Sequence, residues 1–324
     1  MYPIRRKRRL RKSAALRDLV QETHIHPHDF IVPLFVVEGK SVKEEIPSMP
    51  NICRMSLDEI QKEVRLLWKM GLKGVLVFAK VEDRLKDNAG TEALNPDGLM
   101  QRAIQTIKAT VPEMVVFSDV ALDPYSSFGH DGIVENNTIV NDATIDVLAQ
   151  MALSHAQSGA DVVAPSDMMD GRVLHIRKAL ENSGFPETCI MSYAAKYASS
   201  FYGPFRDALD SAPGFGDKKT YQMNPANRKE AMDEVLLDIE EGADLVMVKP
   251  GLAYLDILRD LRDSTNVPLA VYQVSGEYAM LRAAAEKGWL DYETVMMEQL
   301  LAFKRAGASI IASYSAKDAV TLLN

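Results

Sequence analysis

Eight short apolar runs recur along the chain and are separated by segments with helical periodicity. The runs are rich in β-branched residues and apolar at successive positions, as expected of strands buried on both faces of a parallel sheet. Their starting points advance by 44, 40, 47, 28, 54, 25 and 40 residues. They cover residues 30–37, 74–79, 114–119, 161–165, 189–193, 243–248, 268–274 and 308–314. This pattern predicts eight consecutive units of one strand and one helix.

The segments between the runs carry helix-start signals at Ser56, near Asn141 and at Asn224-Pro225. After the last of these, the i, i+3, i+4, i+7 spacing of apolar residues predicts a buried helix face. These residues are Met232, Val235, Leu236 and Ile239. Gly-Ala-Asp or Gly-Ala-Ser precedes several of the later runs, where the glycine is placed to end the preceding helix.

Eight strand–helix units predict an α/β fold, a (β/α)8 TIM barrel. The alternative, a doubly wound open sheet, requires a glycine-rich first turn, and neither GxGxxG nor GxxxxGK[ST] follows any run. A barrel needs roughly 250 residues, fewer than the 324 present. We therefore expect an extended N-terminal arm over 1–28, a single catalytic barrel over 29–324, and an active-site lid over about 203–223.

The composition of the chain limits the classes of protein to which it can belong. With 47% hydrophobic and 25% charged residues the chain is typical of globular proteins, and its longest apolar run, 30–37, is too short to cross a bilayer. Arg17 and Asp18 interrupt the stretch that would be the apolar part of a signal peptide, so we expect a cytoplasmic protein. Two cysteines, Cys53 and Cys189, exclude a disulfide framework and a cysteine-rich zinc site.

The net charge of −8 is unevenly distributed. Residues 5–12 hold seven Lys and Arg residues and no acid, which leaves 30 basic and 45 acidic residues, a charge of −15, in the rest of the chain. A body of that charge repels nucleic acid. The basic segment is interpreted as an arm that lies on the acidic surface of another subunit, with a nucleic-acid or anionic-membrane patch as the alternative.

Two lysines lie where the chemistry of a TIM barrel is found, at the carboxyl ends of the strands. Lys249 follows the sixth run directly, and Lys196 follows the fifth. A buried ammonium is costly, and a second cation nearby makes it lose its proton more easily. The resulting neutral amine is the nucleophile that forms a Schiff base with a ketone. The alternative is a pair of structural lysines that carboxylates bind or that extend to water.

Carboxylates follow the third run. Asp119 and Asp123, with Asp131 further on, have the chemistry to transfer protons or to bind a hard cation such as Mg²⁺. The histidines at positions 24, 26 and 28 are assigned to the arm, because their spacing lacks a fourth metal ligand.

Six long motifs occur in the order Asp119-Val-Ala-Leu-Asp-Pro-Tyr, Ala164-Pro-Ser-Asp-Met-Met-Asp-Gly171, Ser192-Tyr-Ala-Ala-Lys-Tyr-Ala, Phe201-Tyr-Gly-Pro-Phe-Arg-Asp207, Val246-Met-Val-Lys-Pro-Gly and Val274-Ser-Gly-Glu-Tyr. From about Arg8 to the C-terminus the chain closely resembles the porphobilinogen synthase family, also called delta-aminolevulinic acid dehydratase. The resemblance implies a hydro-lyase of heme and chlorophyll biosynthesis. Such an enzyme condenses two molecules of 5-aminolevulinate into porphobilinogen with loss of two waters.

The resemblance also implies roles for individual residues. Family members use two Schiff-base lysines, which match Lys249 for the substrate that becomes the propionate side and Lys196 for the one that becomes the acetate side. Asp119 and Ser166 match residues near the reacting amines, and Asp119 is assigned proton transfer or orientation. The substrate-binding residues implied are Ser275 and Tyr314 for the first carboxylate, Arg206, Lys218 and Gln222 for the second, and also Tyr202 and Phe205. The family often has arginine at the Lys218 position, so bidentate geometry is lost and the charge is kept.

One departure concerns the metal. Zinc-type members carry three cysteines where this chain has Ala121, Asp123 and Asp131, and thiolates are what select zinc, so no catalytic zinc is expected. The chain resembles the aspartate-rich branch, whose members respond to Mg²⁺ at an allosteric site that matches Glu234. Glu234 lies opposite the predicted apolar face of its helix and is expected to be exposed or at an interface. Whether Asp123 and Asp131 hold a second cation is left open.

Family members assemble as octamers through the arm, with hexamers in some, so the resemblance implies a homo-octamer. It implies no organic cofactor and no nucleic-acid or membrane partner. Two alternatives are kept. A class I aldolase with one Schiff-base lysine leaves the second lysine and the 203–223 loop unexplained, and a nucleic-acid-binding protein would use residues 1–12 in a salt-dependent way.

Overall fold

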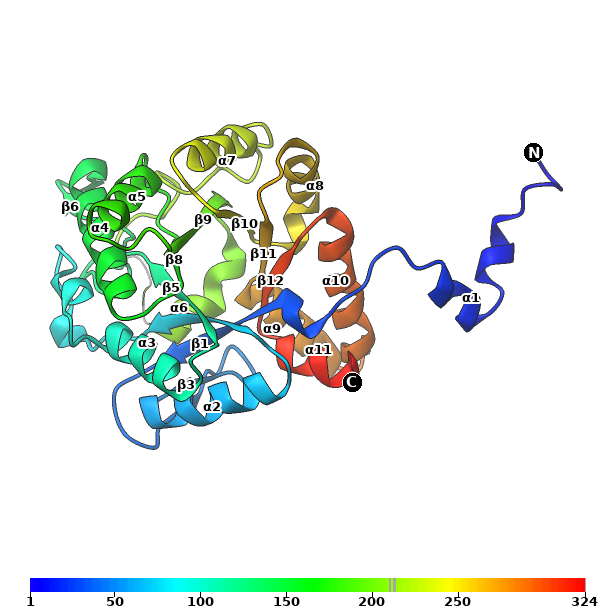
Figure 1. Ribbon diagram of the computed structural model, residues 1–324, viewed down its shortest axis with the longest axis horizontal. Coiled ribbons are helices and arrows are strands. Elements are labelled where there is room, and N and C mark those ends of the chain that lie inside the picture. Colours follow the sequence, from blue (N-terminus) through cyan, green and yellow to red (C-terminus); the bar gives the residue numbers. More distant parts are fainter. Residues whose placement is uncertain (210, 212–213, 324) are drawn as a thin grey trace.

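Eight parallel strands close into a barrel in the computed structural model, which describes residues 1–209, 211 and 214–323 (Figure 1). The barrel strands are β1 Phe30–Val36, β4 Gly74–Ala79, β5 Val115–Val120, β8 Val162–Pro165, β9 Cys189–Lys196, β10 Leu245–Lys249, β11 Leu269–Gln273 and β12 Ile310–Ser313. Each pairs with the next, and β12 pairs with β1. The eight predicted runs coincide with these strands, so the TIM-barrel prediction is confirmed. Positions 210, 212 and 213 of the expected lid lie outside the described residues.

Helices surround the barrel (Figure 1). The principal ones are α2 Leu57–Lys69, α3 Leu99–Thr110, α4 Asn141–Gln157, α5 Arg172–Asn182, α7 Glu230–Glu240, α8 Leu255–Ser264, α9 Ser275–Glu286, α10 Tyr292–Ala306 and α11 Ala316–Leu323. Helix α2 follows Ser56 and α4 begins at Asn141, as predicted. Helix α7 does not begin at Asn224-Pro225, because Asn224 closes a turn instead. Its carbonyl accepts from the Asn227 N–H and its side chain from the Ala226 N–H, each at 2.9 Å.

The predicted apolar face of α7 is only partly right. Val235 is buried, but Leu236 is 40% exposed. The buried stripe is instead Ala231, Val235 and Asp238, which share one face of the helix. A carboxylate can occupy this position because Arg172 Nη1 binds the Asp238 Oδ1 at 2.9 Å. A count of apolar residues does not detect such a pair.

Shorter elements lie in the N-terminal arm and in the loops around the barrel. They are β2 Lys43–Glu45 and β3 Cys53–Met55, β6 Val134–Glu135 and β7 Thr138–Ile139, helices α1 Ala14–Leu19 and α6 Gly203–Leu209, and 3-10 turns η1 Lys7–Arg11, η2 Pro27–Asp29, η3 Asp83–Leu85, η4 Thr91–Leu94, η5 Ser200–Tyr202 and η6 Leu252–Tyr254. The β2–β3 hairpin extends the sheet beside β1, and β6 pairs with β7 alone.

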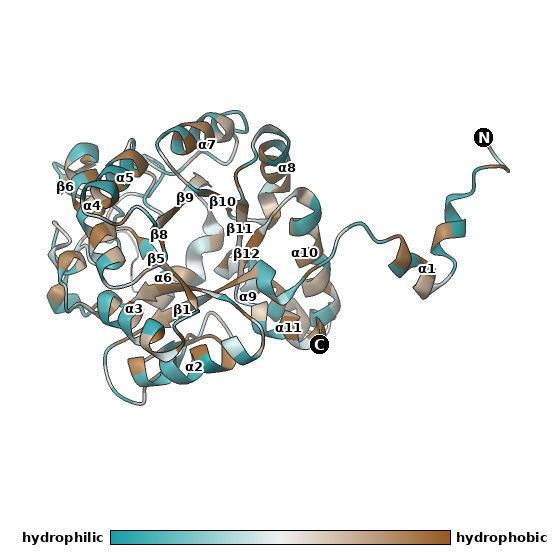
Figure 2. Cartoon of the chain, in the orientation of Figure 1, coloured by the Kyte–Doolittle hydropathy of each residue, from teal (hydrophilic) through white to brown (hydrophobic). Residues whose placement is uncertain are grey.

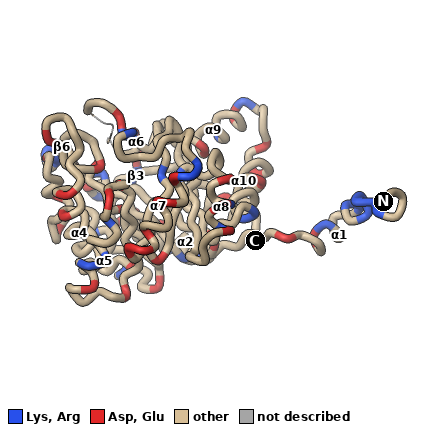
Figure 3. The backbone as a smooth tube through the Cα atoms, turned by 90° about the horizontal axis from the view of Figure 1, so that it is seen from above, with Lys and Arg blue, Asp and Glu red and all other residues tan. Residues whose placement is uncertain are grey.

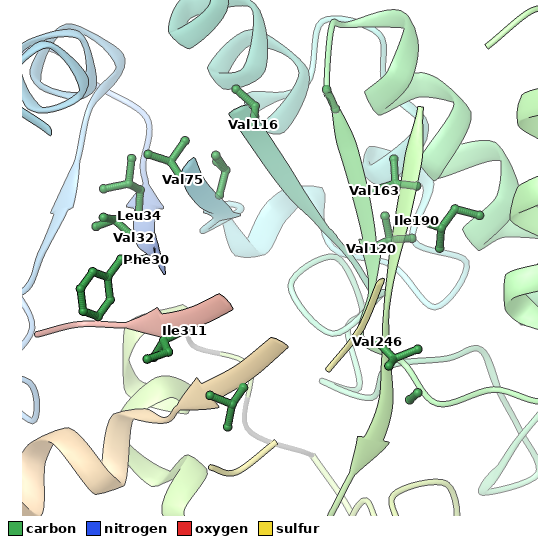
Figure 4. Close-up of a cluster of buried hydrophobic side chains, with 14 of the residues drawn as sticks. Phe30, Val32, Leu34, Val75, Val116, Val120, Val163, Ile190, Val246 and Ile311 are labelled. Atoms are coloured by element: carbon green, nitrogen blue, oxygen red, sulfur yellow. The ribbon is translucent and has the colours of Figure 1, made fainter. Parts of the chain in front are cut away.

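The apolar core has two layers because successive residues of each strand point to opposite sides of the barrel wall. Along β1, Val32 and Leu34 pack outward against helices, whereas Ile31 and Phe35 pack inside the barrel. Figure 4 shows the outer layer, to which β4, β5, β8, β9, β10 and β12 also contribute. Apolar colour concentrates on the strands and the inner sides of the helices in Figure 2. This is why the runs are apolar at consecutive positions.

An N-terminal arm projects from the barrel (Figure 1). Residues 5–12 are all exposed, and the positions of their Lys and Arg residues form the dense blue stretch of the arm in Figure 3, whereas acidic positions are spread over the body. The chain enters the barrel near Ile25, which is buried. Across the described ranges, none of the helices combines the length and apolar character needed to cross a membrane.

Candidate active site

Lys249 and Lys196 are the last residues of β10 and β9, and the parallel register of these strands pairs them directly. Each is only 6% exposed. The fifth run was predicted to end at Tyr193, but β9 continues to Lys196 and so carries this lysine on the strand itself. Both lysines line one cavity at the carboxyl end of the barrel, where the active sites of this fold are found.

Four aromatic rings surround the amine of Lys249. Its Nζ lies 5.0 Å from the ring centre of Tyr193, 5.3 Å from Tyr202, 5.1 Å from Phe205 and 4.6 Å from Tyr272. The rings attract the charged form. Burial opposes this more strongly and, together with repulsion from the Lys196 ammonium, lowers the pKa of Lys249 to about 7. A large fraction of this amine is therefore neutral and nucleophilic near neutral pH.

The amine of Lys196 is held by polar groups. Its Nζ donates a short hydrogen bond to the main-chain carbonyl of Ser166, which directly follows β8. It also forms an ion pair with Asp131 Oδ2 at 3.4 Å. The two lysines thus have different surroundings, aromatic for Lys249 and polar for Lys196.

Asp119 lies near the end of β5 and faces the same cavity. Burial and the neighbouring carboxylate of Asp123 raise the pKa of Asp119 to about 7, against the hydrogen bond from the Ser166 side chain. Its Oδ1 has no hydrogen-bond partner in the described part of the chain. Because Asp119 and Lys249 titrate in the same range, Asp119 has the acidity needed to exchange protons with groups bound at the lysine.

Asp123 and Asp131 are bridged by a side chain from the expected lid. The Nζ of Lys218 lies 2.5 Å from Asp131 Oδ1 and 3.3 Å from Asp123 Oδ2. Burial works to raise the pKa of Asp131, but Lys218 and Lys196 lower it overall. Burial works to lower the pKa of Lys218, and the two carboxylates raise it overall. The cation between these aspartates is therefore a lysine ammonium in this structure.

The cavity between these groups has a volume of about 30 Å³, room for only about one or two waters. The predicted residues that line it are Asp119, Asp123, Ser166, Lys196, Tyr202, Phe205, Arg206, Lys218, Gln222 and Lys249. Phe78 and Ser211 also line it and were not predicted. Phe78 lies next to the end of β4, so strand-end position was a signal for it, whereas Ser211 lies in a loop without one. Tyr193 and Tyr272, whose rings lie beside Lys249, were not predicted either, because an aromatic residue within a strand is normally interpreted as part of the hydrophobic core.

Ser275 and Tyr314 do not line the cavity; Ser275 is bonded to Phe205, which does, and Tyr314 to Tyr272, whose ring lies beside the Lys249 amine. The Ser275 hydroxyl accepts from the Phe205 N–H at 2.9 Å and donates to the Phe201 carbonyl at 3.3 Å. The Tyr314 and Tyr272 hydroxyls are 3.0 Å apart. Glycine follows Ser275 because a Cβ at Gly276 would lie 2.5 Å from the Phe201 carbonyl oxygen.

Helix α6 carries Phe205 and Arg206 over the cavity. Arg54, a buried residue of β3, donates to the carbonyl oxygens of Asp207 and Ala208 in the last turn of this helix. The bond to Ala208 is 2.7 Å long. These carbonyls would otherwise lack partners at a helix end, so Arg54 fixes α6 against the barrel.

Glu234 lies apart from the lysines, on α7, beside a second cavity of about 840 Å³. It is partly buried. Burial raises its pKa, opposed by Arg172 and supported by the carboxylates of Asp238 and Asp170. Within the described ranges, no group of three or more His, Cys, Asp or Glu residues is arranged to hold a metal ion.

Known proteins resemble this chain along its whole length. The family described as delta-aminolevulinic acid dehydratase matches residues 4–322. The delta-aminolevulinic acid dehydratase of Bacillus subtilis is 52% identical over 98% of each chain, and the chloroplastic enzyme of Glycine max is 54% identical over 98% of this chain and 78% of its own. A crystal structure of the Toxoplasma gondii enzyme in complex with the product porphobilinogen is 50% identical, superposes with a TM-score of 0.97, and covers 99% of this chain and 92% of that one. This chain belongs to the delta-aminolevulinic acid dehydratase family.

Proposed function

We propose that the chain is a porphobilinogen synthase that condenses two molecules of 5-aminolevulinate into porphobilinogen, with loss of two waters, in tetrapyrrole biosynthesis. Family membership supports the reaction. The observation that carries the mechanism is the pairing of Lys249 with Lys196 at the ends of adjacent strands in one cavity. Two amines in one site provide for two ketone substrates at once.

The first Schiff base forms on Lys249. Its neutral Nζ attacks the ketone carbon of one 5-aminolevulinate, and the carbonyl oxygen leaves as water once it has been protonated. Asp119, whose pKa is about 7, is the candidate donor of that proton, because it is buried beside the amine and has an unpaired oxygen. The four rings around Lys249 exclude bulk water from the C–N bond.

The second Schiff base forms on Lys196. Asp131 and the Ser166 carbonyl hold this amine in place. Ring closure then joins the two substrates through one C–C and one C–N bond. The C–N bonds to both lysines break, which releases the two amines, and protons lost from substrate carbons complete the pyrrole ring. The short path between register partners brings the two bound ketones together.

The substrates' carboxylates are assigned to groups around this centre. We assign the first carboxylate to Ser275 and Tyr314, which are bonded to Phe205 and Tyr272 near Lys249, and the second to Arg206, Lys218 and Gln222. Lys218 is paired with Asp131 in the present state, so a substrate carboxylate competes for it. A cavity of about 30 Å³ does not hold two substrates, so residues 203–209 and 214–223 must move to admit them.

The two candidate metal sites offer different donor atoms and therefore suit different metal ions. The positions of the zinc cysteines hold Ala121, Asp123 and Asp131, without a thiolate and with Lys218 already bound between the carboxylates, so they do not fit catalytic zinc. Glu234 and Asp170 line the second cavity and offer hard oxygen atoms. Mg²⁺ is often held by one or two carboxylates and waters, so Glu234 fits an allosteric Mg²⁺ of the aspartate-rich branch.

Assembly is proposed to follow the family pattern, a homo-octamer formed through residues 1–28. The arm carries exposed apolar side chains, among them Leu19 at 83% exposure, beside its cluster of cations. Both features suit contact with an acidic neighbouring subunit.

The competing function is an aldolase with one Schiff-base lysine. It gives no role to the buried Lys196, or to the cations Arg206 and Lys218 that line the same cavity. Trapping with borohydride separates the two functions, because an aldolase links one substrate per chain through one lysine.

The decisive experiment is an assay of porphobilinogen formation from 5-aminolevulinate by the purified full-length chain. EDTA is added first, then Mg²⁺, then Zn²⁺ in a separate sample. We expect activity that survives chelation in part and rises with Mg²⁺ but not with Zn²⁺. Absence of product under every condition would refute the proposal in favour of the aldolase, and dependence on zinc would keep the reaction but refute the magnesium assignment.

A further inference from the structure

A histidine outside the reacting groups connects the loop after β5 to the segment that carries Lys218. His130 is 1% exposed, and both of its ring nitrogens are hydrogen-bonded. Nε2 lies 3.1 Å from the carbonyl oxygen of Phe215, and Nδ1 lies 3.0 Å from the hydroxyl of Tyr221. Neither residue that it contacts is assigned a part in the reaction.

The two bonds of the ring go to different kinds of group. A carbonyl oxygen only accepts, so Nε2 carries a hydrogen and donates it to Phe215. Nδ1 is bonded to the Tyr221 hydroxyl, whose oxygen also accepts from the main-chain N–H of Asp131 at 3.4 Å. Each ring nitrogen of His130 is therefore matched to a specific group of residues 214–222.

The attachment points flank a substrate-binding group. Phe215 lies three residues before Lys218 and Tyr221 lies three residues after it. Tyr221 also directly precedes Gln222, whose N–H donates to the Lys218 carbonyl at 2.9 Å. One ring thus holds the segment on both sides of the residue that extends into the cavity.

Aromatic packing adds to these bonds. The Phe215 ring centre is 4.7 Å from that of His130 and 5.9 Å from that of Phe128, and the Gly214 N–H donates to the Phe128 carbonyl at 2.9 Å. Lys218 also pairs with the carboxylates of Asp131 and Asp123, at 2.5 and 3.3 Å, and a substrate carboxylate would compete with both pairs. The contacts of His130 do not compete with substrate.

We propose that His130 is a positioning residue that keeps residues 214–222 over the cavity while Lys218 exchanges Asp131 for the carboxylate of the second substrate. The expected effect on catalysis rests on the proposed function, whereas the attachment of residues 214–222 by His130 does not. Loss of the ring should weaken substrate binding, because Lys218 and Gln222 would then lie in position to bind the substrate in only a fraction of the molecules.

The test compares the full-length H130A, H130Q and Y221F variants with the wild type. Glutamine keeps one donor and one acceptor, and Y221F removes only the hydroxyl bond, so Y221F carries the test if H130A does not fold. Tyr292→Phe is the matched control, since it also removes a partly buried tyrosine hydroxyl, here one bonded to Ser315 and Asp318.

Hydrogen exchange of residues 214–222 is measured first, because it does not depend on activity. We expect exchange in this segment to rise roughly tenfold in H130A and by less in Y221F. H130Q should lie between H130A and the wild type. Exchange in β9 and β10 should not change in any variant. In the condensation assay we expect KM to rise by about tenfold in H130A with kcat changed much less, and H130Q to recover part of it.

Unchanged exchange in both H130A and Y221F would overturn the proposal. Faster exchange with unaltered KM would also overturn it, because the attachment would then not position substrate-binding groups. If wild type forms no porphobilinogen, the proposed function fails on its own, and the exchange result still decides whether His130 holds the segment.

Discussion

Lys249 and Lys196 are register partners on two adjacent parallel strands, and both are 6% exposed. Their surroundings make them chemically unequal. Burial and the neighbouring ammonium lower the pKa of Lys249 to about 7, whereas Lys196 binds Asp131 and the Ser166 carbonyl. The proposed mechanism accordingly assigns the first Schiff base to Lys249 and the second to Lys196.

Lys249→Ala is expected to abolish covalent trapping of the first substrate by borohydride. In the wild type, trapping at Lys249 should rise with pH through a midpoint near 7, because the amine must be neutral to attack and becomes so above its pKa. Mass spectrometry of the trapped chain measures both effects. Full trapping in the variant would refute the assignment of Lys249.

Lys196→Ala is expected to leave one trapped substrate per chain and no porphobilinogen. Removal of the Lys196 ammonium should also shift the trapping midpoint of Lys249 to higher pH, because that charge helps to lower its pKa. Lys196→Arg is the control, since it keeps the charge but forms no Schiff base. Measurable turnover by the alanine variant would contradict a second Schiff base at this position.

Glu234→Ala is expected to retain activity and to lose the response to Mg²⁺. Activity should persist because Glu234 lines the second cavity and not the one that contains the two lysines. Glu240→Ala serves as control, because Glu240 is an exposed carboxylate at the end of the same helix. The measurement is the activity of each variant over a Mg²⁺ titration after chelation, and an unaltered curve for Glu234→Ala would remove the site.

Asp238→Ala is expected to lower the free energy of unfolding by about 3–5 kcal/mol, because it leaves the buried Arg172 guanidinium without its carboxylate partner. The two side chains are bonded at 2.9 and 3.0 Å deep between α5 and α7. Chemical denaturation measures the change. The control is Asp260→Ala, which breaks an exposed pair with Arg228 and should leave the unfolding midpoint nearly unchanged.

Deletion of residues 1–12 is expected to reduce the molecular mass of the assembly, measured by light scattering after size exclusion, without loss of the fold. These residues are exposed and belong to the arm, outside the barrel. A full-length variant with glutamine at the seven basic positions separates the effect of charge from that of length. An unchanged mass for the deletion would contradict the role of the arm, and salt-dependent binding to nucleic acid would favour the alternative.

The sequence by itself determined the barrel and identified the two lysines at its strand ends. The eight runs are apolar at consecutive positions because β1 and its counterparts pack on both faces, as Val32 outside and Phe35 inside illustrate. Their position at the strand ends then identified Lys249 and Lys196 as candidates, because the carboxyl ends of all strands lie at the same end of a parallel barrel. Both features are local patterns that a linear chain displays directly.

The tertiary structure alone decided how these groups are paired. Lys218 lies 87 residues from its partner Asp131, and His130 lies 85 residues from Phe215. Nothing in a linear pattern specifies such contacts, because they depend on which loops the barrel brings together. The burial of Asp238, which lies outside the predicted apolar face of its helix, and the rings around Lys249 have the same origin. Local periodicity thus specifies which face of an element is buried, whereas pKa values and ion pairs follow from the partners that folding places against that face.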